Sequence, residues 1–173
     1  MSVLEVQGLT VRFRQDGRVT EAVRNVSFAV GKGETVALVG ESGSGKSVTA
    51  LSTVALLPDA AEVTGSITYN GRQMVGADAA TLRSIRGNDI SFIFQEPMTS
   101  LNPAFTIGDQ ISEAILRHRK VTHTEAGKQA VAMLERVRIP APERRFHAYP
   151  HQLSGGMRQR AMIAMALACG PKL

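Results

Sequence analysis

The sequence predicts an α/β fold with a helical region in its second half. Three observations predict it. The apolar run at residues 35–39 is continuous, which is typical of a strand buried on both faces of a parallel sheet. A loop rich in glycine and serine follows it and leads into a stretch with helical character, residues 46–57. From residue 107 to 137 apolar side chains recur at i, i+3, i+4 and i+7, with charged residues on the opposite face.

The remaining elements follow from alternating or β-branched residues and from turn signals. Asp16-Gly17 and Asn70-Gly71 are predicted turns, and Pro58 is expected to end the first helix. We expect strands over residues 3–6, 9–13, 22–30, 66–69 and 90–94, the last of them buried, and helices over 77–85 and 156–169.

The change of pattern after residue 95 divides the chain into three parts. We expect an α/β core with an N-terminal β subdomain over residues 1–95, a helical subdomain over 96–160, and the start of a return to the core over 161–173. A second interpretation of the helical part stays open, namely a solvated bundle that carries no chemistry, because periodicity alone does not exclude it.

The composition excludes several classes of protein. A length of 173 residues with 43% hydrophobic residues fits about one globular domain. The longest apolar run, residues 161–169, is much shorter than the roughly 18 residues that a membrane span needs. The single cysteine, Cys169, cannot form an internal disulfide and is expected to be a small buried hydrophobe. The net charge of +5 favours an anionic partner, but the basic residues look scattered, so nucleic acid is not expected.

The segment from Gly40 to Ser47 matches the phosphate-binding motif G-x-x-x-x-G-K-[ST], between a predicted strand and a predicted helix. The N–H groups of residues 43–47 can form an anion nest at the helix start. We expect Lys46 to reach the β- and γ-phosphates of a nucleoside triphosphate and Ser47 to ligate Mg²⁺. The alternative is an ordinary turn rich in glycine and serine. The predicted nucleotide contacts here are Gly40, Glu41, Ser42, Gly43, Ser44, Gly45, Lys46, Ser47 and Val48.

A second motif opens the last predicted helix, where Ser154 is a good N-cap and Gly155 and Gly156 leave the backbone accessible. Alone, it could be a capped helix start with a flexible entry. With the phosphate loop, it resembles the ATP-binding subunits of ABC transporters, whose signature is LSGGQ; this chain reads LSGGM, with Gln159 further along. The stretches FQEPMTSLNP at 94–103 and YPHQ at 149–152 resemble the branch that imports dipeptides, oligopeptides, nickel or glutathione.

The resemblance implies a P-loop NTPase core with an inserted helical subdomain, and ATP and Mg²⁺ as ligands. It implies that Gln95 contacts Mg²⁺ and the attacking water, so that Gln95 and Lys46 are the catalytic residues and Ser47 and Gln95 hold the metal. It also implies that Phe13 stacks on adenine, although Phe13 could equally be a core-facing strand aromatic. The nucleotide contacts implied in the signature are Ser154, Gly155, Gly156 and Gln159.

The resemblance also implies partners. Residues 96–105 would meet a coupling helix of transmembrane permease subunits. Residues 154–156 would close on the γ-phosphate held by a second ATP-binding subunit or half, in a head-to-tail dimer. A periplasmic solute-binding protein would take part indirectly. The protein would lie peripherally on the cytoplasmic face of the inner membrane, and a soluble ABC-type ATPase is a less favoured alternative.

Family members of this kind carry an acidic pair at the end of a further strand, where it holds Mg²⁺ and polarises water. The last acidic residue here is Glu143, before the signature. We therefore expect a fold that is incomplete at the C-terminus, and a non-hydrolysing nucleotide-binding fragment is the alternative function. Two buried strands would then lack neighbours, so we expect that the chain alone is poorly stable or needs a partner chain, and that it shows no cooperative melting above about 50 °C.

Overall fold

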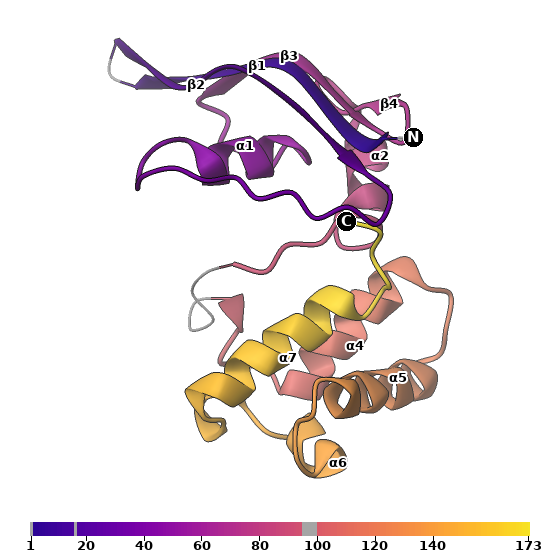
Figure 1. The fold of residues 1–173 in the computed structure, drawn as a ribbon. Coiled ribbons are helices and arrows are strands. Elements are labelled where there is room, and N and C mark those ends of the chain that lie inside the picture. The colour runs from indigo at the N-terminus through magenta and orange to yellow at the C-terminus, as the bar shows by residue number, and fades with distance from the viewer. Residues whose placement is uncertain (1, 16, 95–99) are drawn as a thin grey trace. The chain divides into compact units, whose positions relative to one another are not determined.

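A computed structural model describes residues 2–15, 17–94 and 100–173. Two compact units make up the chain, Met1–Arg83 and Ser84–Leu173, and each is described by itself (Figure 1). The division into three parts at residues 95 and 160 stays a prediction.

The first unit contains a four-stranded antiparallel sheet with the order β2-β1-β3-β4. Every second side chain of β1 is buried on either side of an irregularity between Val6 and Leu9, namely Leu4 and Val6 before it and Leu9 and Val11 after it. This confirms the strands predicted at 3–6 and 9–13 as parts of one long strand. The elements of this sheet are β1 (Ser2–Gln15), β2 (Arg18–Gly31), β3 (Ala61–Tyr69) and β4 (Arg72–Gln73). The strands predicted at 22–30 and 66–69 lie within β2 and β3.

The turn between β3 and β4 confirms its sequence signal. Asn70 and Gly71 have φ angles of 46° and 76°, as a two-residue hairpin turn with left-handed central residues requires. Two short helices complete the segment up to residue 85, namely α1 (Lys46–Ser52) and α2 (Ala79–Ile85). Figure 1 shows α1 against one face of the sheet.

The helix predicted over 46–57 ends earlier than Pro58. After Ser52 the backbone forms a helix C-cap. The N–H of Ala55 donates to the carbonyl of Ser52, and the N–H of Leu56 donates to the carbonyl of Leu51. Ala55 has a φ of 53°, so the helix ends in the left-handed closure that usually takes glycine. An alanine gives no sequence signal for such an ending.

The predictions of buried strands at 35–39 and 90–94 were wrong. Neither segment is a strand, and Val39 and Phe94 are 92% and 51% exposed. Ile90 forms one isolated bridge with Arg86. A parallel strand exists only where neighbouring strands accept its hydrogen bonds. Over the described ranges, neither segment has a strand of the chain paired along it.

The second unit is helical, as the periodicity predicted. Its elements are α4 (Ile107–His118), α5 (His123–Arg136), α6 (Pro142–Phe146), the 3₁₀ turn η1 (Pro150–Gln152) and α7 (Gly155–Leu167). The core of this unit is formed by the predicted apolar faces, including Ile111, Ile115, Ala130 and Leu134. Cys169 is buried beside them, as expected.

Hydroxyl side chains start three of these helices. Thr106, Thr122 and Ser154 each accept a hydrogen bond from the backbone N–H three residues further on. Each cap satisfies a donor that a helix start leaves without an intrahelical partner. The predicted N-cap at Ser154 is therefore confirmed, and α7 begins within the signature motif, at Gly155.

Candidate nucleotide-binding site

The phosphate loop lies between β2 and α1, and Gly45 fixes its end. Gly45 has a φ of 88° and is the N-cap of α1. A Cβ at this position would lie 2.4 Å from the carbonyl oxygen of Ala22 and 3.2 Å from Cγ2 of Val23. Only a residue without a side chain lets the loop approach β2 so closely. The last glycine of the motif is therefore required both by its backbone angle and by its neighbours.

The start of α1 presents unused backbone donors. The N–H of Thr49 makes the first intrahelical bond, 2.8 Å to the carbonyl of Gly45. The N–H groups of Lys46, Ser47 and Val48 precede it in the first turn, where an α-helix offers no acceptor. Ser47 is exposed, so its hydroxyl is accessible beside these donors. The arrangement suits an anion with several oxygens.

Lys46 folds back over the loop. Its ammonium group donates to the carbonyl oxygens of Gly40 and Glu41, at 2.8 and 2.6 Å, and to Oγ of Ser44 at 3.2 Å. These acceptors are uncharged, so phosphate oxygens would be stronger partners for the same charge. The oxygens of the loop thus hold the Lys46 ammonium group at the loop, where it could exchange them for the oxygens of a bound polyphosphate.

Phe13 belongs to the face of the sheet that the loop contacts. Val11 of β1 pairs with Val23 of β2, and Val23 is the residue nearest to Gly45 after Ala22. Phe13 follows Val11 by two residues and shares its face of the strand. Phe13 is half-buried, so part of its ring stays accessible. Stacking on a nucleobase stays a prediction that this placement supports.

The signature motif presents a bare helix start. Gly155 and Gly156 are exposed, and a Cβ at either position would meet nothing within 4 Å. The packing of this chain therefore does not require glycine there. Behind them, Arg158 donates from Nε to the carbonyl of the buried Leu153 at 3.0 Å. Gln159 is exposed on the first turns of α7. The motif lies in the second unit, and the phosphate loop lies in the first.

Gln95 and residues 96–99 lie outside the described residues. The segment that follows them is held by Gln110, which the sequence did not single out. The side-chain oxygen of Gln110 accepts from the N–H of Asn102 at 2.9 Å, and its nitrogen donates to the carbonyls of Asn102 and Phe105 at 3.0 and 3.1 Å. A glutamine on an amphipathic helix gives no sequence signal for this role. Phe105 is 53% exposed on the loop so fixed.

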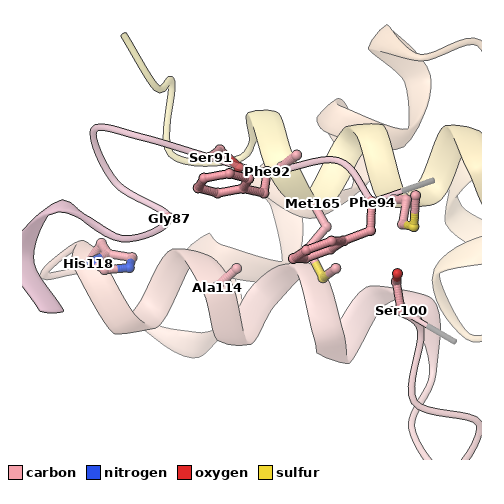
Figure 2. A pocket seen from close by; sticks show the side chains of 10 residues that line it. Gly87, Ser91, Phe92, Phe94, Ser100, Ala114, His118 and Met165 are labelled. Atoms are coloured by element: carbon pink, nitrogen blue, oxygen red, sulfur yellow. The ribbon is translucent and has the colours of Figure 1, made fainter. Parts of the chain in front are cut away.

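A cavity of about 500 Å³ in the second unit is mostly apolar. Figure 2 shows Phe92 and Phe94 beside Met165, and the two rings are stacked with centroids 6.1 Å apart. The one titratable side chain among its described lining residues is His118, whose pKa is lowered by burial and by the charges of Arg117 and Arg119. Such a lining does not suit a polyphosphate.

Within the described ranges no group of three or more histidine, cysteine, aspartate or glutamate side chains could hold a metal ion. No helix among the described residues has the length and apolar character that crossing a bilayer requires.

Three comparisons relate the chain to known proteins. Residues 23–173 match the family described as ABC transporter. The dipeptide transport ATP-binding protein DppD of Bacillus subtilis is 53% identical over 173 residues, which cover 99% of this chain and 52% of that protein. The glutathione import ATP-binding protein GsiA of Salmonella choleraesuis is 51% identical, with 98% of this chain and 28% of that protein covered. The chain therefore spans about half the length of DppD and less than a third of the length of GsiA.

Solved structures agree with the sequence comparisons. The dimeric structure of MJ0796, a bacterial ABC transporter cassette, superposes with a TM-score of 0.82 at 29% identity and covers 97% of this chain and 70% of that one. A post-hydrolysis state of the same cassette, bound to ADP and Pi, gives a TM-score of 0.83 at 27% identity with the same coverage. The family match covers most of the chain and includes both motifs, so the chain belongs to the ABC transporter family.

Proposed function

We propose that the protein is the ATP-binding subunit of an ABC importer for peptides or glutathione, and that ATP binding and hydrolysis power the import. The observation that carries the proposal is the phosphate loop, in which Gly45 is fitted against β2, Lys46 donates to carbonyls of the loop itself, and α1 begins directly after Gly45. The choice of solute class rests on relatives that are named as dipeptide, peptide and glutathione import proteins.

The residues present fit ATP and Mg²⁺. The close approach that Gly45 allows, the donors of residues 46–48 and the Lys46 charge suit the β- and γ-phosphates. The hydroxyl of Ser47 and the side chain of Gln95 would hold Mg²⁺, which prefers oxygen ligands and takes most of the others from phosphate and water. When bound, Mg²⁺ neutralises charge on the phosphate oxygens. Phe13 would stack on the adenine ring.

The proposed partners follow from the second unit. The open glycines of the signature suit the γ-phosphate of ATP held by a second ATP-binding subunit in a head-to-tail pair. The dimeric structure of a similar cassette supports the pairing of two such subunits. Residues 96–105 would contact the permease subunits, with Gln110 holding the loop from Asn102 to Phe105 in shape. A periplasmic solute-binding protein would act indirectly. The complex would place this subunit on the cytoplasmic face of the inner membrane.

A second function has one specific observation in its favour. No acidic residue follows Glu143 in these 173 residues, so the chain as given supplies no carboxylate after the signature to polarise water. The chain by itself would then bind nucleotide without hydrolysing it. Phosphate release separates the two functions, because clear Mg²⁺-dependent turnover by the 173-residue chain contradicts the non-hydrolysing one.

Lys46→Ala is expected to weaken ATP binding at least about tenfold, because charge-assisted hydrogen bonds contribute roughly 1.5–3 kcal/mol. A fluorescent ATP analogue titrated into the chain measures the change. Lys32→Ala is the matched control, since Lys32 is an exposed lysine of the same unit outside the loop motif. Equal affinities of the Lys46→Ala variant and the parent chain would defeat the assignment of the phosphate loop.

A further inference from the structure

The net charge of the chain is concentrated in one stretch. Residues 136–160 contain six arginines and a single acidic residue, Glu143. This stretch accounts for the whole formal excess of +5, because the other residues hold fourteen basic and fourteen acidic side chains. The basic residues look scattered along the sequence, but the excess of positive charge lies in this one stretch. A local excess of this size creates a positive potential that attracts anions.

The fold brings these arginines to one end of the helical unit. Figure 1 shows the end of α5, α6 and the start of α7 gathered there, and α5 packs against both α6 and α7. Nη1 of Arg160 on α7 donates to the carbonyl of Arg138 after α5, at 2.9 Å. Four arginines at this end are exposed, and we call them the arginine surface: Arg136, Arg138, Arg144 and Arg160.

The arginine surface lacks counter-charges within the chain. In the part of the chain that the structure describes, none of its four guanidinium groups lies within 4.0 Å of a carboxylate. By contrast, Arg12, Arg14 and Arg24 of the first unit all pair with glutamates. Arg160 donates to the uncharged carbonyl of Arg138, so this hydrogen bond leaves the guanidinium charge without a carboxylate counter-charge. An anionic partner would supply that counter-charge.

The backbone at Arg138 gives an independent reason to look for a role of its side chain. Helix α5 ends in a Schellman closure, in which the N–H of Arg138 bonds to Glu135 and that of Ile139 to Leu134. Arg138 therefore occupies the left-handed position, with a φ of 58°. Glycine is favoured there, and an arginine costs backbone energy. A strained residue of this kind is grounds for a functional hypothesis.

We propose that the arginine surface docks an acidic polypeptide segment of a partner protein. The planar fork of arginine suits bidentate contacts with carboxylates, and the stretch contains no lysine. A bilayer is the less favoured anion, because Tyr149 is the one exposed large apolar side chain recorded for the described residues 136–160, and surface binding to lipid needs apolar insertion besides charge. The proposal does not depend on nucleotide hydrolysis.

Fluorescein-labelled decaglutamate, followed by anisotropy with the 173-residue chain at low salt, tests the proposal. Arg136→Gln/Arg144→Gln is expected to weaken binding about fivefold, since each exposed charge pair contributes modestly. Neither side chain has a hydrogen bond or ion pair recorded in the described residues, so the variant keeps its fold, which circular dichroism checks. Added salt is expected to weaken binding by the parent chain as well.

Arg117→Gln/Lys120→Gln is the matched control, because both residues are exposed in the same unit and the variant loses the same charge. It is expected to bind decaglutamate within about twofold of the parent chain. Lys46→Ala should also retain this binding, which separates the proposal from the nucleotide site. Equal weakening in both double variants, no binding of decaglutamate, or stronger binding to vesicles of phosphatidylcholine and phosphatidylserine would overturn it.

Discussion

Gly45→Ala is expected to abolish nucleotide binding and to destabilise the first unit by about 3 kcal/mol, the sum of a left-handed alanine and a clash with backbone. The new Cβ would lie 2.4 Å from the carbonyl oxygen of Ala22, whose neighbours Glu21 and Val23 in β2 both pair with β1. The start of α1 would have to leave β2 and take the donors of residues 46–48 with it. Urea unfolding and titration with a fluorescent ATP analogue measure the two effects.

Gly43→Ala separates the clash from the backbone angle. Gly43 has a φ of 82°, close to that of Gly45, but a Cβ there would meet nothing within 4 Å. Its alanine variant is expected to lose only about 1 kcal/mol, the usual cost of a left-handed residue. If Gly43→Ala and Gly45→Ala destabilise the chain equally, the contact with Ala22 has no part in shaping the loop.

Local patterns in the sequence were enough to predict most of the fold. Alternation along β1 and the turn at Asn70-Gly71 were confirmed because both depend on residues a few positions apart. The helical spacing and the Ser154 cap were confirmed for the same reason. The phosphate loop was recognised because its chemistry requires fixed residue types at fixed spacing.

The errors concern features that depend on distant residues. The runs at 35–39 and 90–94 have the composition of buried strands, but a strand also needs neighbours to pair with, and composition does not supply them. The role of Gln110 and the left-handed backbone of Arg138 were missed because each follows from a backbone path that the sequence does not reveal. The predicted role of Gln95 falls outside the described residues.

The second large effect is expected at Gly108, near the start of α4. A Cβ at Gly108 would lie 2.3 Å from the ring of Phe146, which occupies the space beside the first turn of α4. Gly108→Ala is therefore expected to destabilise the second unit by about 2 kcal/mol, as overpacking does. The same turn carries the Thr106 cap and Gln110, so the loop from Asn102 to Phe105 should loosen as well. Urea unfolding followed by helical circular dichroism measures the loss.

Gly127 also lies beside the ring of Phe146, and its substitution is a control that is expected to raise stability where Gly108→Ala lowers it. A Cβ at Gly127 would lie 3.7 Å from Cζ of Phe146, an ordinary contact, and Gly127 is inside α5. Gly127→Ala is therefore expected to stabilise the unit by about 0.5–1 kcal/mol through helix propensity. Phe146→Leu in the Gly108→Ala background should recover part of the lost stability, because the smaller side chain leaves room for the methyl group. If the effects of Gly108→Ala and Phe146→Leu on the free energy of unfolding are additive, Phe146 is not what requires glycine at position 108.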